Sequence, residues 1–294
     1  MQYPAIAIAP YGTRFSGRYD RMSCDALIWP LGQPRRLQGA TLAEMGEQDH
    51  LILYPRNEFH LRPFHRLNAK ISLMVQEPRV IHGHHRRWLG LSHRKFFRVL
   101  THDRALINRI PNGVFVPFGT TWVPDWQDRD LTKTRMCSLI ASAKRSQEGH
   151  RLRHEIVDWA RAEGLPLEAM GGGYAPFDAK ADGLAPFRYS VVIENAREPD
   201  YFSEKLVDSV LCLTVPIYWG CPNIADYMPV EGMVICESAA DIQKALRSMS
   251  EADYAARLPG LQAARPKAAL WTDLERRTAE ALRESLRESQ RKPF

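Results

Sequence analysis

The sequence has little that would staple it through disulfides or anchor it in a membrane. Its cysteines are odd in number and scattered, with no C-x-x-C spacing, so neither a disulfide framework nor a zinc site is indicated. No apolar run reaches the roughly 18 residues of a membrane helix, and the residues after Met1 lack the basic and apolar regions of a signal peptide. We therefore expect a cytoplasmic protein whose cysteines are buried free thiols: Cys24, Cys137, Cys212, Cys221 and Cys236.

The usual signs of a nucleic-acid-binding protein are also missing. The sequence has no RNP motif, no zinc knuckle and no long run of lysine and arginine. The formal charge of +6 and the isoelectric point of about 9.1 still favour an anionic partner. Nucleic acid, an anionic membrane surface and a phosphorylated ligand would each fit that charge, but for nucleic acid the charge is the sole indication.

What the sequence does contain is a regular alternation of short apolar runs with helical stretches. Over 294 residues, of which 45% are hydrophobic and 25% charged, this pattern predicts a globular α/β protein of two domains. The first half should form a mainly parallel, helix-covered sheet. Its expected strands span residues 5–9, 26–29, 50–54, 71–75, 96–101 and 113–116, with a short helix at 42–47.

The second half repeats the alternation after a polar stretch without periodicity. It predicts an α/β domain over residues 136–270, joined to a first domain over 1–123 by a linker at 124–135 and followed by a charged helix within 271–294. Strands are expected at 136–141, 167–170, 189–193, 215–219 and 233–236, and helices at 149–163, from 203, at 239–249, 251–257 and 272–289.

The most informative stretch is the strand, helix and strand predicted within residues 187–220. Its helix starts near Ser203, a favoured N-cap residue, which places Glu204 and Lys205 in the first turn. The N–H groups and dipole at a helix start favour a phosphate, and a lysine adds a full positive charge. Glu204 fits a ribose, since acidic residues accept hydrogen bonds from sugar hydroxyls. The combination indicates a nucleotide diphosphate, although Ser-Glu-Lys at a helix start is also ordinary capping chemistry.

The same stretch resembles the donor-binding segment of the α1,3/4-fucosyltransferases, glycosyltransferase family 10, in a short bacterial-type form. In that family the pattern runs F-E-N-S, then Y-x-T-E-K, then T-[VI]-P-[VI]-x-x-G. Here Ile193, Ala196 and Ser203 replace the family's Phe, Ser and Thr. The resemblance is carried by Glu194-Asn195, Tyr201, Glu204-Lys205 and the run from Thr214 to Gly220.

This resemblance implies a GT-B-like fold, with two facing Rossmann-like domains and a C-terminal helix. It also implies an inverting transfer of L-fucose from GDP-fucose to a glycan hydroxyl, without a metal or other cofactor. Glu194, Asn195, Tyr201 and Glu204 are then donor-binding residues, and Lys205 stabilises the leaving diphosphate. By residue type alone, Asn195 and Tyr201 are equally compatible with ordinary turn or packing roles.

Inverting transfer needs a general base, and Glu77 is the candidate in the first half. It follows the apolar run 71–75 by two residues, at the carboxyl end of a predicted strand, where ligands bind in such sheets. The resemblance reinforces this choice, because the fucosyltransferases carry a Glu in an E-S-P or G-E-N setting at the comparable place. Residues 99–103 and 116–119 likewise resemble the family's L-T-Y-R and V-P-Y-G segments. Glu77 directly precedes Pro78, a departure that leaves a solvated loop glutamate as the alternative.

Three basic residues could contact the diphosphate from the segment after the strand at 136–141. Arg153 lies early in the next predicted helix, in a setting where the family places a phosphate-contacting arginine. Arg151 and Lys144 are rivals, and each of the three could instead be an exposed charge.

Two further motifs resemble metal sites. Asp128-Arg129-Asp130 has the D-x-D pattern of metal–nucleotide sites, but no apolar strand precedes it, so it reads as solvated linker. The histidines of residues 82–85 could ligate a metal. Without cysteines or helical spacing they favour a mobile basic loop on the acceptor side.

The charged C-terminal run has apolar residues at Leu274, Ala279, Leu282 and Leu286, close to one helical stripe. The stripe predicts a helix that packs back on the body, or a peripheral anchor on the inner face of the membrane. Two other functions stay open: a transferase that uses another GDP-hexose, and a nucleotide-sugar-binding protein without turnover.

Overall fold

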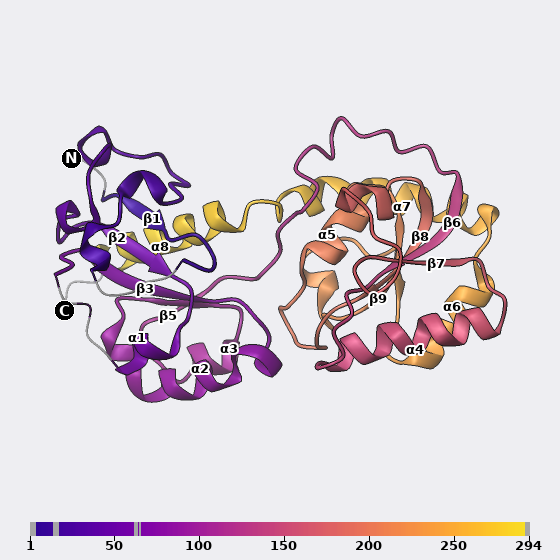
Figure 1. Ribbon diagram of the computed structural model, residues 1–294, viewed down its shortest axis with the longest axis horizontal. Helices are drawn as coiled ribbons and strands as arrows, with labels where there is room; N and C mark the ends of the chain where they lie inside the picture. The colour runs from indigo at the N-terminus through magenta and orange to yellow at the C-terminus, as the bar shows by residue number, and fades with distance from the viewer. Residues whose placement is uncertain (1–3, 14–17, 62–63, 65, 292–294) are drawn as a thin grey trace. The chain divides into compact units, whose positions relative to one another are not determined.

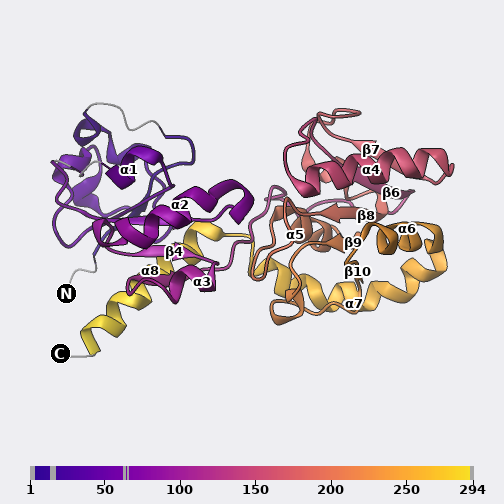
Figure 2. The same ribbon diagram turned by 90° about the horizontal axis from the view of Figure 1, so that it is seen from below.

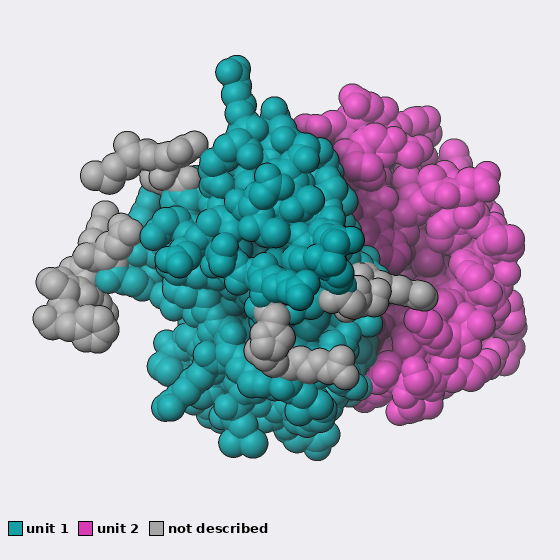
Figure 3. Space-filling model, turned by 60° about the vertical axis from the view of Figure 1, so that its left-hand side comes forward, with its two compact units in different colours: residues 1–117, 274–294 teal, residues 118–273 magenta. Residues whose placement is uncertain are grey.

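The computed structural model describes residues 4–13, 18–61, 64 and 66–291, and it falls into two compact units (Figure 3). Unit 1 comprises residues 1–117 and 274–294, and unit 2 comprises residues 118–273. Each unit has its own five-stranded sheet, and the named strands pair in parallel throughout. The expected α/β fold built on parallel sheets is confirmed.

In unit 1 the strands follow one another in chain order across the sheet. Right-handed crossovers in such an order place every connecting helix on the same face. Figure 1 shows α2 and α3 on that face. The elements are β1 (Ile6–Ile8), β2 (His50–Leu53), α1 (Asn57–Leu61), β3 (Lys70–Val75), α2 (Arg79–Ser92), β4 (Val99–Thr101), α3 (Arg104–Ile107) and β5 (Gly113–Phe115).

The opposite face of this sheet is covered by α8 (Leu274–Arg291), which comes from the far end of the chain (Figure 1). Leu274, Ala279 and Leu282 are buried, and the hydroxyl of Thr278 lies 3.2 Å from the sulfur of Met74 in β3. The apolar stripe of the C-terminal helix is therefore used inside unit 1. No helix in the described part of the chain is both long and apolar enough to cross a membrane.

Two expected elements of unit 1 are wrong in kind. The strand at 26–29 is a 3₁₀ turn, Cys24–Ala26, followed by a single antiparallel bridge between Ile28 and Ile8. The carboxylate of Asp25 accepts the N–H of Gly39, which holds this segment in a turn rather than an extended run. The helix at 42–47 is likewise only a 3₁₀ turn, Leu42–Glu44. Further 3₁₀ turns lie at Tyr19–Arg21, Arg35–Leu37 and His93–Lys95.

The largest correction in unit 1 concerns residues 82–85, which form part of α2 rather than a mobile loop. Pro78 occupies the N-cap position, where its missing N–H costs nothing. The buried side chains are His82, His85, Arg86 and Leu89, at spacings of three, four and seven residues. Residues at these spacings lie on one face of a helix. Most of them are polar residue types, so the hydrophobic periodicity of the sequence does not indicate the helix.

Unit 2 has a different strand order, β10-β9-β8-β6-β7. Figures 1 and 2 show α4 and α6 on one face of the sheet and α5 and α7 on the other. The sheet is formed by β6 (Arg135–Ile140), β7 (Leu167–Met170), β8 (Phe187–Ile193), β9 (Val215–Trp219) and β10 (Val234–Ile235). The helices are α4 (Glu148–Ala162), α5 (Glu204–Leu211), α6 (Ala239–Ser248) and α7 (Glu251–Ala269), with 3₁₀ turns at Lys180–Gly183 and Ile224–Asp226.

These elements follow the expected ones closely, with one extension. α7 continues from its expected end at residue 257 to Ala269, through Pro259 and Pro266. All five cysteines are buried free thiols, as expected.

Residues from the predicted linker are attached firmly to unit 2. The ammonium of Lys133 donates to the carbonyls of Ala185 and Cys212, each at 2.7 Å, and to the hydroxyl of Thr214 at 3.0 Å. Burial lowers the pKa of Lys133 to about 7. The sequence of residues 124–135 is typical of a linker, but the side chain of Lys133 anchors this segment to unit 2.

Candidate functional site

The predicted donor-binding residues lie at the carboxyl edge of the unit 2 sheet, between β6 and β8. The chain runs outward in one direction from β6 to β7 and in the other from β8 to β9, so the strand order reverses between β6 and β8. Crevices at such reversals are where open α/β sheets bind ligands. The loops that leave these two strands lead into α4 and α5.

The start of α4 lies directly against the end of β8. The N–H of Gly149 donates to the carbonyl of Asn195 at 3.2 Å. A Cβ on Gly149 would fall 1.7 Å from the carbonyl oxygen of Glu194, so only glycine permits this approach. The glycine brings a helix start and the Glu194-Asn195 strand end into one site.

Glu194 is the buried anchor of the site, with no solvent exposure. Its two carboxylate oxygens accept the N–H of Ser203 at 2.8 Å and the hydroxyl of Ser203 at 2.7 Å. Ser203 is the N-cap of α5, as the sequence predicts, and accepts the N–H of Lys205 at 3.3 Å. Glu194 therefore fixes the start of α5, and its role in binding the donor stays a prediction.

Lys205 and Glu204 form an ion pair in the first turn of α5, at 2.9 Å. The Lys205 ammonium also donates to the Ser203 hydroxyl at 3.1 Å and lies 3.7 Å from Glu194. Burial acts to lower the pKa of Lys205, but the two carboxylates outweigh it and the pKa is raised. Burial acts to raise the pKa of Glu204, but Lys205 and Lys180 hold it below its usual value. Both groups are therefore ionised at neutral pH.

Arg153 reaches the same strand end from α4. Its guanidinium donates to the carbonyl of Ile193 and to the side-chain oxygen of Asn195, the latter at 3.2 Å. Burial lowers its pKa from the ordinary value. Of the three predicted phosphate contacts, Arg153 is buried in the site, whereas Arg151 and Lys144 are exposed on the loop and helix beside it.

Tyr201 belongs to the loop between β8 and α5 and is buried, only 1% exposed, with its ring 5.7 Å from that of Phe118. The loop itself is held at Asp200, which has a positive φ of 62°. The N–H of Asp200 donates to the side-chain oxygen of Asn223, and its carboxylate accepts from Asn223 and from the hydroxyl of Tyr227. These hydrogen bonds hold the loop in one conformation without a ligand.

Two cationic or titratable side chains in this region were not predicted from the sequence. Lys180 lines a cavity of about 20 Å³ together with Lys205 and Ile193. His150 is buried one helical turn before Arg153, and burial together with Arg153 and Lys144 lowers its pKa to about 4. His150 could have been found from its i, i+3 spacing to Arg153. Lys180 carries no such signal, because its loop has no periodic pattern.

The site as a whole can stabilise an anion. Arg153, Lys180 and Lys205 face two carboxylates, Glu194 and Glu204, which leaves a formal charge of +1. The dipole of α5 adds positive potential at the helix start. Such an arrangement suits a diphosphate better than a simple acid–base reaction.

Glu77 lies in unit 1, after the carboxyl end of β3, and is partly buried. Its main-chain carbonyl accepts a hydrogen bond from Arg86 in α2 at 2.9 Å. The position at the strand end agrees with the sequence reading, and the role as a base stays a prediction.

The two metal-like motifs have no metal-site geometry in the described residues, where no three His, Cys, Asp or Glu side chains are grouped as ligands. Asp128 and Asp130 are exposed, and the Asp130 carboxylate accepts from the N–H and hydroxyl of Thr132.

No model of a protein family matches the chain. A fucosyltransferase-like protein of Arabidopsis thaliana is 28% identical over 153 residues, which are 49% of this chain and 28% of that protein. An alpha-(1,3)-fucosyltransferase of Helicobacter pylori is 35% identical over 51 residues, 17% of this chain and 11% of that protein. A second, from Drosophila melanogaster, is 39% identical over 46 residues, 16% of this chain and 10% of that protein.

Parts of the chain are thus similar in sequence to α1,3-fucosyltransferases and to a fucosyltransferase-like protein. The alignments span less than a third of the length of these relatives.

Solved structures agree on a GT-B fold for this chain. The N-terminal domain of Candida albicans trehalose-6-phosphate phosphatase superposes with a TM-score of 0.57 at 11% identity, over 82% of this chain and 70% of that one. S. aureus TarM gives a TM-score of 0.55 at 9% identity, over 82% and 55%.

Proposed function

We propose that this chain is an inverting, metal-independent glycosyltransferase that moves L-fucose from GDP-fucose to a hydroxyl of a glycan. The observation that carries the proposal is the convergence of Arg153, Lys180 and Lys205 with the α5 start at the strand reversal of unit 2. The sequence similarity to α1,3-fucosyltransferases supports fucose as the sugar.

In this mechanism the cationic cluster stabilises the charge that develops on the departing GDP. Lys205 is already held by Glu204 and the Ser203 hydroxyl, so it needs little reorganisation when a diphosphate arrives. Asn195 and Glu204 supply polar groups for the nucleotide sugar. Glu194 and Tyr201, being buried, support the α5 start and the preceding loop from within.

Glu77 is proposed as the base that takes the proton from the acceptor hydroxyl as the glycosidic bond forms. The support is its place at the carboxyl end of β3 and its match to the family's glutamate. Glu77→Gln should cut turnover by roughly 10²- to 10⁴-fold while GDP affinity stays nearly unchanged. Glu47→Gln, an exposed position in the same unit, is the matched control. Equal turnover in Glu77→Gln would remove Glu77 from the mechanism.

The donor site is tested by calorimetric titration of GDP, with UDP as the competing nucleotide. Lys180→Gln removes one cation while leaving both carboxylates their Lys205 partner, and it should weaken GDP binding by roughly tenfold. Arg151→Gln removes an exposed charge nearby and should have little effect. GDP binding without transfer to any offered glycan would instead favour a nucleotide-sugar-binding protein. Stronger binding of UDP than of GDP would refute the choice of donor.

A further inference from the structure

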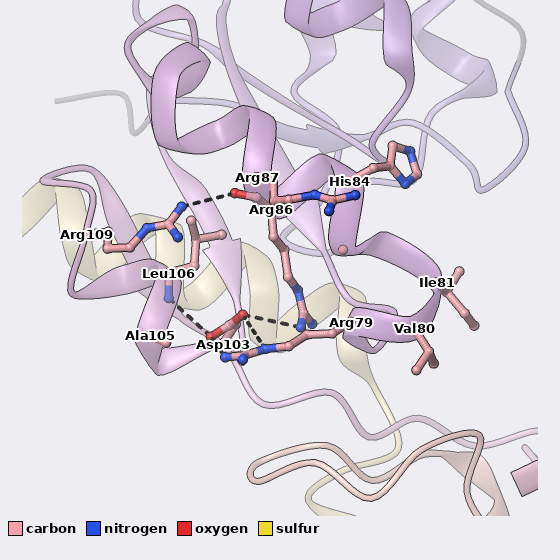
Figure 4. A pocket seen from close by; sticks show the side chains of 11 residues that line it. Arg79, Val80, Ile81, His84, Arg86, Arg87, Asp103, Ala105, Leu106 and Arg109 are labelled. Atoms are coloured by element: carbon pink, nitrogen blue, oxygen red, sulfur yellow. Dashed lines mark hydrogen bonds and ion pairs between the residues drawn. The ribbon is translucent and has the colours of Figure 1, made fainter. Parts of the chain in front are cut away.

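Unit 1 contains a strongly basic groove that the donor site does not use. A cavity of about 480 Å³ lies between α2 and α3 (Figure 4). Four arginines line it against one carboxylate, Asp103, which leaves a formal charge of +3. The basic groove is defined by Arg79, Arg86, Arg87, Arg109 and Asp103.

The single carboxylate is already fully engaged. Asp103 accepts from Arg79 at 2.9 and 3.2 Å and from the N–H of Leu106 at 3.1 Å, and it lies 3.3 Å from Arg86. Figure 4 shows both guanidinium groups converging on it. Arg87 and Arg109 form no ion pair within the described residues. Asp103 therefore orients two of the arginines and leaves the charge of the other two uncompensated.

The face of α2 that lines the groove has no side chain at two positions. Gly83 and Gly90 lie seven residues apart, on the same face as Arg86 and Arg87. A Cβ at Gly83 would meet nothing within 4 Å, and one at Gly90 would fall 2.9 Å from Nη2 of Arg109. The first glycine keeps the groove open, and the second gives the Arg109 guanidinium room to cross the helix, where its Nη2 donates to the carbonyl of Arg86 at 3.4 Å.

The groove is joined to the residue proposed as the base. Arg86, buried at its floor, donates to the main-chain carbonyl of Glu77 at 2.9 Å. We propose that the basic groove binds an oxyanion, a phosphate or a carboxylate, carried by the acceptor glycan. The inference rests on the proposed function and narrows its acceptor to an acidic glycan.

Arginine suits this task because its planar fork of donors matches a carboxylate or phosphate in two parallel hydrogen bonds. The groove walls also exclude part of the solvent, which strengthens the attraction compared with a fully exposed pair. A neutral glycan could accept hydrogen bonds from these arginines but would lack the charge attraction.

The anion site is tested first with inorganic phosphate, by NMR titration of the arginine Nε–H signals in protein saturated with GDP. GDP occupies the donor site, so that phosphate reports on the groove. We expect saturable shifts at Arg87 and Arg109, and at least about tenfold weaker binding in the double variant Arg87→Gln, Arg109→Gln. Arg94→Gln, which removes an exposed charge outside the groove, is the control and should match the unaltered protein. Unsaturable shifts, or equal binding in the double variant, would overturn the site.

The acceptor class is tested with the neutral disaccharide lactose and two anionic relatives of it: lactose 1-phosphate, and lactobionate, in which the glucose ring is opened and oxidised to a carboxylate. The two anionic sugars should bind about tenfold more tightly than lactose. The double variant should abolish this advantage, and the tighter of the two identifies the carboxylate or the phosphate as the natural group. Equal affinity of all three sugars would overturn the inference while leaving GDP binding intact. Absence of GDP binding would instead overturn the proposed function.

Discussion

At the scale of single residues, a buried aspartate should make the stability of unit 2 depend on pH. Asp208 in α5 is fully buried and accepts the hydroxyl of Thr121 at 2.5 Å and the N–H of Trp122 at 3.1 Å. Burial raises the pKa of this carboxyl from 3.8 to about 7. The folded state therefore keeps its proton between these values while the unfolded state has lost it. The favourable effect of this protonation on the free energy of unfolding is fully present below pH 3.8. It is lost as the pH rises towards 7, by at most about 4 kcal/mol.

The measurement is the free energy of unfolding by urea at several pH values from 4 to 8, for the unaltered chain and for Asp208→Asn. The free energy of unfolding of the unaltered chain should fall relative to that of Asp208→Asn as the pH rises through this window, since the amide does not titrate. Lys133, whose pKa of about 7 affects stability between that value and 10.5, is present in both proteins, so its contribution cancels in the comparison. A pH-independent difference would mean that Asp208 is ionised in the folded protein.

Residues whose role is set by their immediate sequence were the ones that could be predicted. Ser203 caps α5 and Lys205 occupies its first turn, both of which follow from local capping preferences. Arg153 was found through its place early in α4. Lys180 reaches the site across the fold, and the burial of Glu194 and Tyr201 depends on packing. Neither long-range property leaves a periodic trace in the sequence.

At the scale of elements, the contact between α4 and the end of β8 should decide whether the donor site is formed. Gly149→Ala would place a methyl carbon in the space of the Glu194 carbonyl oxygen and force the helix start away. We expect a loss of roughly 1–3 kcal/mol in the free energy of unfolding, the usual cost of overpacking. The displaced Arg153 and Asn195 should also weaken GDP binding by roughly tenfold or more.

The matched control is Gly172→Ala, because a Cβ at that position meets nothing within 4 Å and the residue is exposed. Thermal unfolding and GDP calorimetry of the two variants give the comparison. Unchanged GDP affinity in Gly149→Ala would show that the donor site does not depend on this contact.

Elements with a clear apolar period were predicted well, and those with a concealed one were not. The strands at 167–170 and 215–219 agree with the structure at both ends. α2 was missed because its buried face carries two histidines and an arginine. α7 was ended too early because Pro259 and Pro266 read as helix breakers, yet the helix continues through both. The two parallel sheets follow from alternating strands and helices, whereas their different strand orders do not.

At the scale of the whole molecule, the chain returns to complete its first unit only at its last helix. α8 covers one face of the unit 1 sheet, although residues 118–273 intervene. Each unit has its own buried core. Leu282→Ala in α8 should therefore destabilise unit 1 by about 2–5 kcal/mol, the range for a buried leucine, and leave unit 2 unaffected.

Hydrogen exchange resolved along the chain tests this, because each strand reports on its own unit. Leu282→Ala should speed exchange in β3 and β4 but leave β8 and β9 as they were. Leu261→Ala in α7, equally buried in unit 2, should give the reverse pattern. If either substitution speeds exchange equally in both sheets, the units unfold as one cooperative body, and the last helix stabilises the entire protein instead of its first unit alone.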